Sequence, residues 1–362
     1  MKIAILSMQR VINFGSVLQA YSLAKMIEEI TGIQPEFIDI DDIQTIPCDI
    51  SVKGDADYKV EADLPPGILQ KIKRRFFWKL SKLNDKKIKE FTKMVLHLDD
   101  NTESYYDYVV IGSDEVFNLT SGLRLQLFGN VNQARQVISY AASCGTAVYE
   151  DIPKKNLEQV KSALKNFKAM SVRDFGTKEF IGRLYDGKIE MNLDPVLMGN
   201  LYTRNHKKVF IKDYILVYAY GNRIRTKEEI EAIQKFAKKK NLKTVAIGGV
   251  QFWCDLYIPA SPFRVLDYFY YANYIVTDTF HGTIFSVINH KKFVTIVRKT
   301  NTNKIESLLK NLHLDSRLVS DIHKLEKVMI NDIDYKSVDQ YLEKKRIEAY
   351  DYLKRNLVEI NE

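Results

Sequence analysis

Short apolar runs alternate with amphipathic segments along most of the chain, and this alternation predicts an α/β fold. Apolar, β-branched runs predict buried strands at residues 2–8, 36–40, 108–111, 137–142, 170–172, 214–218, 243–247, 274–277 and 293–297. Helical spacing of apolar positions predicts helices at residues 16–30, 156–168, 226–239, 262–271, 283–289 and 307–314. Strand, polar turn and helix in repeated succession are typical of doubly wound parallel sheets.

The same succession begins twice, which predicts two domains. A chain of 362 residues is long enough for two α/β cores, and a polar, basic segment at residues 199–213 separates the halves. We therefore expect Rossmann-like domains at residues 1–200 and 201–362, the second closed by a charged helix at 337–358. Ligands of such sheets bind at the carboxyl ends of the strands. A central cleft between two lobes, as in many sugar transferases, is the expected site.

One turn of the second half concentrates polar residues between a strand and a helix. The strand at 274–277 is followed by Asp278, Thr279, His281 and Gly282. Unpaired N–H groups and the helix dipole favour an anion at such a turn. His281 is suited to exchange a proton with that anion near neutral pH. The alternative is that Asp278 or Thr279 only caps the helix and His281 is an ordinary turn residue.

Polar turns also follow strands of the first half. After the first strand, Asn13 offers a donor and an acceptor to hydroxyl groups, and Gly15 permits close backbone approach. An ordinary connection capped by Ser16 is the alternative. After the strand at 108–111 comes a second polar turn, and it contains Ser113, Asp114 and Asn118.

Two arginines follow predicted strands directly. Arg173 comes after the strand at 170–172, and Arg298 comes after the strand at 293–297. A guanidinium fork at the ligand edge can bind a phosphate or a carboxylate in two hydrogen bonds. For Arg173, a structural ion pair with a neighbouring carboxylate is the alternative.

The net charge of +8 arises from one predicted helix. Residues 70–93 hold ten Lys or Arg and two acidic residues, and elsewhere basic and acidic residues are equal in number. This concentration argues against the broad basic surface of a nucleic-acid-binding protein. The basic insertion, at residues 68–98, packs as a helix on its own domain with a solvated face, or else lies on an anionic membrane surface. In the second case Phe76, Phe77 and Trp78 would insert into the lipid.

The cysteines and the terminal sequence favour a cytoplasmic protein. Three cysteines, far apart along the chain, predict neither a disulfide framework nor a metal site. The amino terminus enters a strand without the features of a secretory signal, and no apolar run has the length of a membrane span. We expect no metal and no cofactor.

Six segments, in this order and spacing, resemble the polysaccharide pyruvyl transferase family over most of the chain. They are Asn13–Tyr21, Val110–Asp114 with Asn118, Ser139–Ser143 with Gly145, Ser171–Asp174, Asp194–Pro195 and Thr277–Gly282. The resemblance implies a GT-B-like fold and transfer of a pyruvyl group from phosphoenolpyruvate to a surface polysaccharide. The usual product of the family is a cyclic ketal across two sugar hydroxyls.

The resemblance and the chemistry together assign roles to the polar turns. Phosphoenolpyruvate carries a phosphate and a carboxylate, which need several positive or N–H donors. The donor-side candidates are Arg173, Arg298, Lys304 and the amides of Gly282 and Thr283. The acceptor-side candidates are Asn13, Gly15, Ser113, Asp114 and Asn118, of which Asp114 would orient or deprotonate the hydroxyl. His281 would protonate the methylene carbon, or alternatively donate a hydrogen bond to phosphate.

The chain departs from the family pattern at four positions. Family members often carry Gln and Trp where this chain has Glu115 and Phe117, and Ser where it has Thr279. An Arg is common where Lys304 stands, and a Lys there would weaken any two-bond grip on phosphate. The first pair of changes would alter the choice of acceptor, as would the loop at 41–67.

Two other functions fit parts of the pattern. A nucleotide-sugar glycosyltransferase of the same fold fits the two lobes. A non-catalytic scaffold of polysaccharide assembly, held on the membrane through residues 70–93, fits the concentrated charge. The sequence leaves open which sugar accepts the pyruvyl group and whether the acceptor is linked to a lipid.

Overall fold

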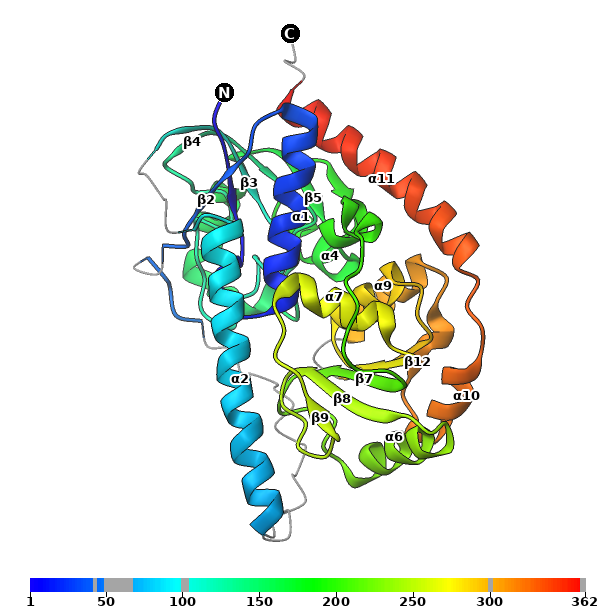
Figure 1. Cartoon of the computed structure of the whole chain (residues 1–362). Helices are drawn as coiled ribbons and strands as arrows, with labels where there is room; N and C mark the ends of the chain where they lie inside the picture. Colours follow the sequence, from blue (N-terminus) through cyan, green and yellow to red (C-terminus); the bar gives the residue numbers. More distant parts are fainter. Residues whose placement is uncertain (42–43, 49–67, 99–103, 299–301, 359–362) are drawn as a thin grey trace.

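The chain forms two lobes, each built on a parallel sheet of six strands, in the computed structural model (Figure 1). The structure describes residues 1–41, 44–48, 68–98, 104–298 and 302–358. Most of the loop at 41–67, which we expected to influence acceptor choice, lies outside these residues.

The first lobe is a doubly wound sheet in the order β2-β1-β3-β4-β5-β6. Its strands are β1 (Ile3–Leu6), β2 (Glu36–Ile38), β3 (Tyr106–Ile111), β4 (Ala134–Ser139), β5 (Phe167–Val172) and β6 (Ile189–Met191). Its helices include α1 (Phe14–Thr31), α3 (Leu157–Leu164), α4 (Phe175–Gly182) and the short α5 (Pro195–Met198). Every neighbouring pair of strands is parallel.

The second lobe repeats the plan in the order β12-β11-β10-β7-β8-β9. Its strands are β7 (Tyr214–Ala219), β8 (Lys243–Gly248), β9 (Leu256–Tyr257), β10 (Tyr274–Thr277), β11 (Phe293–Ile296) and β12 (Leu318–Val319). Its helices are α6 (Lys227–Lys239), α7 (Pro262–Tyr271), α8 (Phe280–Ile288), α9 (Thr302–Asn311) and α10 (Leu325–Ile330). The predicted fold class, two Rossmann-like α/β domains, is confirmed.

The order of the strands locates the expected ligand edge of each sheet. The winding changes direction between β1 and β3 in the first lobe and between β7 and β10 in the second. Ligands of doubly wound sheets bind at such switch points, outside the carboxyl ends of the strands. The segments after these four strands all contribute to the cleft described below.

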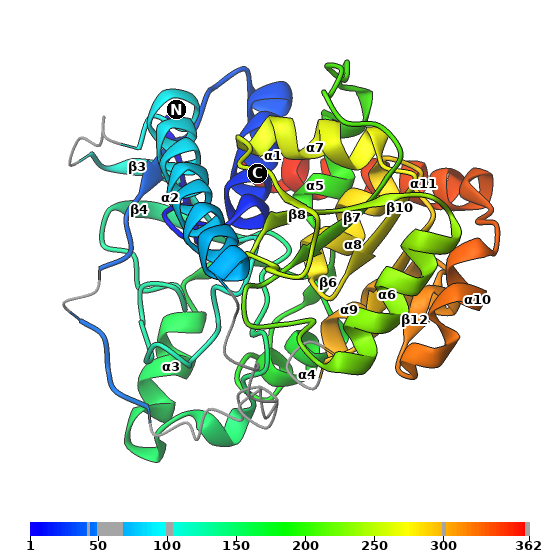
Figure 2. The same cartoon turned by 60° about the horizontal axis from the view of Figure 1, so that its bottom comes forward.

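Helix α2 (Ile68–Val95) lies against both lobes, although it belongs to the first by sequence (Figure 2). Phe91 of α2 packs edge-on against Tyr21 of α1 and Phe263 of α7, with ring centroids 6.3 and 5.0 Å away. Nearer the start of α2, Phe77 packs on Phe252 and Tyr257. Because Phe77 is buried there, it does not insert into lipid as one interpretation of the sequence required.

Helix α11 (Tyr335–Leu357) leaves the second lobe and returns along the first (Figure 1). The hydroxyl of Tyr352 donates to the carbonyl of Ser139 at 2.8 Å, and that of Tyr350 donates to Glu29 at 2.6 Å. Arg346 donates to the carbonyl of Leu197 at 3.2 Å. At its start, the hydroxyl of Tyr335 donates to the carbonyl of Lys291 in the second lobe at 2.6 Å, so the last helix joins the two lobes. None of the described helices is both long enough and apolar enough to span a membrane.

Candidate functional site

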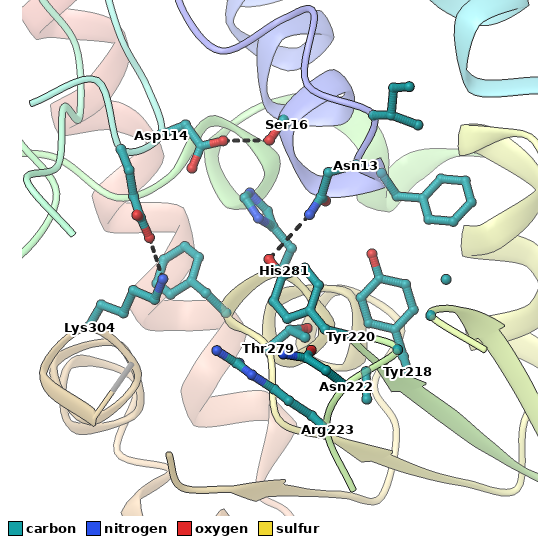
Figure 3. Close-up of a pocket in the computed structure, with 18 of the residues that line it drawn as sticks. Asn13, Ser16, Asp114, Tyr218, Tyr220, Asn222, Arg223, Thr279, His281 and Lys304 are labelled. Atoms are coloured by element: carbon teal, nitrogen blue, oxygen red, sulfur yellow. Dashed lines mark hydrogen bonds and ion pairs between the residues drawn. The ribbon is translucent and has the colours of Figure 1, made fainter. Parts of the chain in front are cut away.

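A cleft of about 1350 Å³ opens between the carboxyl edges of the two sheets (Figure 3). The first lobe contributes Asn13, Ser16, Asp114, Glu115 and Arg173, and α2 contributes Trp78, Ser81, Asn84, Asp85 and Ile88. The second lobe contributes Tyr218, Tyr220, Asn222, Arg223, Arg225, Thr279, Phe280, His281 and Lys304, among others. Five of the residues predicted from the sequence therefore line one space: Asn13, Asp114, Arg173, His281 and Lys304.

Asn13 caps α1 and reaches across the cleft. Its side-chain oxygen accepts from the amide of Gly15 at 2.7 Å, which satisfies an N–H group at the start of the helix. Its amide nitrogen donates to the hydroxyl of Tyr220, 3.2 Å away in the other lobe (Figure 3). Asn13, and not Ser16, is therefore the cap of α1.

Asp114 faces the cleft from the end of the β3 edge. Its backbone has φ 75°, a left-handed conformation that aspartate tolerates better than most residues. One carboxylate oxygen accepts from the hydroxyl of Ser16 at 2.7 Å, and the other lies 3.9 Å from Arg173 Nη2. The carboxylate is thus oriented by Ser16 and lies beside a cation.

Arg173 is buried at the floor of the cleft, with 4% of its surface exposed. Its Nη1 donates to Asp194 at 2.8 Å, and its guanidinium lies 4.2 Å above the ring of Phe280. Its Nε has no hydrogen-bond partner among the described residues. The structural ion pair considered for Arg173 exists, and the same side chain also lines the cleft.

His281 lies in the first turn of α8 and points toward the first lobe (Figure 3). Thr279 caps this helix, since its hydroxyl accepts from the amide of Gly282 at 2.9 Å. The Nε2 atom of His281 is 3.4 Å from Asp194 Oδ2. Burial alone would raise the pKa of Asp194, but His281 and Arg173 lower it to about 2. This carboxylate is ionised at neutral pH and lies beside both side chains. It accepts a hydrogen bond from Arg173, whereas His281 Nε2 has no hydrogen-bond partner among the described residues.

Lys304 of α9 pairs with Glu115 of the first lobe across the cleft. The Lys304 ammonium lowers the pKa of Glu115 to about 2. A second hydrogen bond, from Asn118 at 2.7 Å, fixes the same carboxylate. Two departures from the family pattern, Glu115 and Lys304, are thus partners of each other.

This ion pair predicts a pH-dependent contribution to stability. Because the pKa of Glu115 is lowered on folding, the unfolded chain binds more protons between about pH 5 and pH 2. The pair therefore stabilises the fold at neutral pH, and this contribution is lost as the pH falls. We expect Glu115→Gln to lower the free energy of unfolding at pH 7, and its difference from the wild type to shrink by about 1 kcal/mol at pH 4.

Urea unfolding at the two pH values measures this difference. The control is Glu158→Gln, because Glu158 pairs with Lys161 at 3.0 Å on the surface, with 83% of its side chain exposed. Screening by solvent leaves such a pair little effect on stability. A destabilisation by Glu115→Gln that is equal at pH 7 and pH 4 would contradict the assignment.

A polar loop after β7 was missed by the sequence analysis. Tyr220, Asn222 and Arg223 all line the cleft (Figure 3). The guanidinium of Arg223 lies 4.9 Å from the ring centre of Tyr220 and donates to the carbonyl of Asp278 at 3.4 Å. The switch-point rule could have located this loop, because it follows a central strand of the sheet.

Several predicted residues lie behind the cleft wall and do not line it. Arg298 is buried, and it donates to Asp278 at 3.0 Å and to Glu229 at 2.6 Å. Burial raises the pKa of Asp278 to about 6 although Arg298 lies beside it. Other members of this group are Gly15, Ser113, Asn118, Gly282 and Thr283, which are absent from the lining. The residues of the turn at 278–282 therefore have different roles: Asp278 belongs to a buried ion pair, Thr279 caps the helix, and His281 reaches the cleft.

The amides of the α8 turn are largely occupied within the protein. The amide of Gly282 donates to Thr279, and that of Thr283 donates to the carbonyl of Thr279 at 3.1 Å. The hydroxyl of Ser113 donates to the carbonyl of Ala141 at 2.9 Å. These groups hold the turns in shape.

Within the described part of the chain, no cluster of three His, Cys, Asp or Glu side chains could hold a metal ion.

Comparison with known proteins identifies both the family and the fold. A family model described as polysaccharide pyruvyl transferase matches residues 13–300, well over half of the chain. No curated protein sequence gives a significant match.

Solved structures resemble this chain at low sequence identity. MnaA from S. aureus, solved with UDP, aligns with TM-score 0.53 and 13% identity over 100% of this chain and 98% of its own. A UDP-GlcNAc 2-epimerase from Methanocaldococcus jannaschii, in complex with UDP-GlcNAc and UDP, gives TM-score 0.49 and 16% identity over 97% and 100%. UGT89C1 from Arabidopsis thaliana, complexed with quercetin, gives TM-score 0.48 and 12% identity over 98% of each chain. The likeness to MnaA shows only the fold, which is GT-B-like.

Proposed function

Because the chain belongs to the polysaccharide pyruvyl transferase family, we propose that it transfers a pyruvyl group from phosphoenolpyruvate to two hydroxyls of a sugar. The acceptor is a cell-surface polysaccharide or its lipid-linked repeat unit, and the product is a pyruvate ketal. The reaction leaves inorganic phosphate.

One observation carries the proposal: four cationic side chains converge with His281 on one cleft. They are Arg173, Arg223, Arg225 and Lys304. Phosphoenolpyruvate needs such a set, since its phosphate and carboxylate both require charged donors. Lys304 binds the donor by giving up part of its ion pair with Glu115. Because this ion pair joins the two lobes, it also affects how the lobes hold the substrate.

The proposed chemistry balances with groups of the cleft. His281 delivers a proton to the methylene carbon, which becomes the methyl group and leaves a cationic centre at the neighbouring carbon. One sugar hydroxyl bonds to that carbon and loses its proton to a base. The second hydroxyl then bonds to it as the carbon–oxygen bond to phosphate breaks, and its proton leaves with phosphate. Asp194 cannot serve as the acid at neutral pH, because its pKa is lowered to about 2.

Asp114 is the proposed base for the acceptor hydroxyl. Its carboxylate lines the cleft, and Ser16 orients it at 2.7 Å. Asn13, which reaches the cleft from the same lobe, binds a neighbouring hydroxyl through its amide. The remaining predicted residues support these groups: Asn118 holds Glu115, and Ser113, Gly282 and Thr283 hold the turns.

Arg298 has a supporting role in this scheme. Its bond to Asp278 at 3.0 Å neutralises the carboxylate that precedes Thr279 and α8. An unpaired carboxylate there would oppose binding of an anion at the helix start. The donor therefore benefits from Arg298 without touching it.

The position of Gly15 gives a test of the role of His281. A Cβ atom at Gly15 would lie 2.1 Å from His281 Nδ1, so the imidazole must move in Gly15→Ala. A displacement of about 1 Å at a reacting group can lower the rate by about 100-fold. We expect a loss of that size in phosphate release. The midpoint of thermal unfolding should also fall, because the added Cβ would lie 2.8 Å from His281 Cβ and such overpacking costs about 1–3 kcal/mol.

Gly176→Ala is the matched control for this substitution. Its Cβ would meet a single atom, Asp174 Oδ1, at an ordinary 3.5 Å, and the residue does not line the cleft. Full activity of Gly15→Ala would show that the position of the imidazole is not critical.

Thermal-shift titration with phosphoenolpyruvate, beside UDP-sugars, tests the proposed donor without an acceptor. A ligand at a hundred times its dissociation constant stabilises the fold by about 2.7 kcal/mol. We expect a rise of the unfolding midpoint with phosphoenolpyruvate and none with UDP-sugars. The opposite result would favour a nucleotide-sugar glycosyltransferase, and vesicle binding without any turnover would favour a scaffold.

A further inference from the structure

Helix α2 also exposes apolar side chains, on a face about a third of a turn away from the one that it buries. The exposed fractions are 78% for Ile68, 60% for Ile72, 57% for Phe76, 41% for Leu83 and 68% for Met94. The buried side chains of the helix include Phe77, Asn84, Ile88 and Phe91. A surface helix of a globular protein normally has one apolar face, which packs on the core. The second apolar face of α2 therefore needs a separate explanation.

The spacing of the exposed residues makes them one continuous stripe. Ile68, Ile72 and Phe76 follow each other at intervals of four, and Leu83 follows at an interval of seven. At 3.6 residues per turn these intervals keep the side chains on one side of the helix. We call Ile68, Ile72, Phe76 and Leu83 the outer stripe.

Basic side chains flank the outer stripe. Lys71, Arg75, Lys79, Lys82 and Lys86 are all exposed. The acidic residues of α2 are Asp85, which lines the cleft, and Glu90, which lies 3.7 Å from Lys86. We call the side of α2 that carries the outer stripe and these basic side chains the outer face. It combines large apolar side chains with an excess of positive charge.

We propose that the outer face of α2 docks on the surface of an anionic lipid bilayer. A helix at a membrane interface inserts its apolar side chains between headgroups while its Lys and Arg bind anionic lipids. The helix of 28 residues is about 40 Å long, enough for a contact of several turns along the surface. Nucleic acid would satisfy the charges and leave Ile68, Ile72 and Phe76 in water. The charge and the stripe together favour lipid.

Docking in this way would bring the cleft close to the membrane. Other faces of α2 contribute Trp78, Ser81 and Asp85 to the cleft wall. The bilayer and this wall would be separated by about the 10 Å diameter of one helix. If the proposed reaction is correct, an acceptor anchored in the bilayer by its lipid can extend its sugars into the cleft. The docking itself does not depend on the reaction.

Cosedimentation of the full-length protein with lipid vesicles tests the inference. We expect binding to vesicles of equimolar phosphatidylcholine and phosphatidylglycerol, weaker binding as salt is raised, and little binding to phosphatidylcholine alone. Reversing three charges on the outer face, in Lys71→Glu, Arg75→Glu and Lys79→Glu combined, should weaken binding about 100-fold or more. Phe76→Ser with Ile72→Ser should weaken it about 10-fold at unchanged charge.

The chain offers a control with the same change in net charge. Lys235, Lys238 and Lys240 are exposed in and beside α6. Their triple replacement by Glu changes the net charge as much as the triple variant of the outer face does, and it should leave vesicle binding within about two-fold of the wild type. Equal loss in both triple variants would mean general attraction between charges and would overturn the proposal. Binding to both vesicle types alike, binding to neither, or self-association through the outer face without lipid would overturn it as well.

Turnover on a soluble acceptor separates this inference from the proposed reaction. The variants of the outer face should retain phosphate release within about two-fold, because none of their residues lines the cleft. Lost vesicle binding with retained turnover would support both proposals. A protein that binds vesicles through α2 and lacks turnover would leave docking intact and overturn the reaction.

Discussion

Replacement of His281 by Gln is expected to lower the rate of phosphate release from phosphoenolpyruvate by about 100- to 10,000-fold, the usual contribution of a general acid. Glutamine can donate a hydrogen bond and cannot transfer a proton at this site. The affinity for phosphoenolpyruvate should change much less, since Arg173, Arg223 and Lys304 remain in the cleft. Steady-state kinetics of the purified variant with a fixed acceptor measures kcat and KM separately.

This substitution also separates the two roles that the sequence left open for His281. If the imidazole only donates a hydrogen bond to phosphate, His281→Gln should keep most of its activity while His281→Ala loses it. His323→Gln is the control, because His323 is exposed and does not line the cleft. Near-normal kcat in His281→Gln would contradict the proton transfer.

Replacement of Arg173 by Lys is expected to raise KM for phosphoenolpyruvate by about 10- to 100-fold. In the wild type, Arg173 Nη1 lies 2.8 Å from Asp194 and the guanidinium stacks on Phe280. The lysine ammonium keeps the positive charge beside Asp194 but loses the planar fork and the stacking. A hydrogen bond to a charged group contributes about 1.5–3 kcal/mol, which corresponds to this loss of affinity. The midpoint of thermal unfolding should fall only modestly.

A second substitution separates binding from stability at the same position. Arg173→Met leaves Asp194 buried with less compensation, and loss of one partner of a buried pair costs about 3–5 kcal/mol. This variant should unfold at clearly lower temperature than Arg173→Lys. The control is Arg183→Lys, since Arg183 stacks on Tyr149 at 3.9 Å and pairs with Glu150 outside the cleft. Unchanged KM in Arg173→Lys would contradict donor binding by the guanidinium.

The alternation of apolar and polar segments predicted most of the fold. Strand β10 and helix α7 have the predicted bounds, because both are marked by apolar residues and clear breaks. Short edge strands such as β9 and β12 were not predicted, since two residues carry no periodicity. Helix α8 begins at Phe280, three residues before its predicted start, because the cap is Thr279 and the glycine lies inside the helix.

Contacts between distant segments limited the prediction of the site. Lys304 and Glu115 are 189 residues apart, and no local pattern joins them. Arg298 follows its strand as predicted, but Asp278 and Glu229 draw it behind the wall, and only the packed fold brings these three together. The packing of α2 on the second lobe was equally hidden, because the helix has apolar residues on more than one face.

The transfer itself can be followed by NMR with phosphoenolpyruvate labelled with ¹³C at its methylene carbon. The acceptor is the surface polysaccharide of the source organism, freed of its own ketals by mild acid. We expect the methylene signal to be replaced by a methyl signal on the polysaccharide, with one phosphate released for each, and His281→Gln to slow this change by about 100- to 10,000-fold. A methylene signal that stays unchanged while the protein consumes a UDP-sugar in the same mixture would contradict the account.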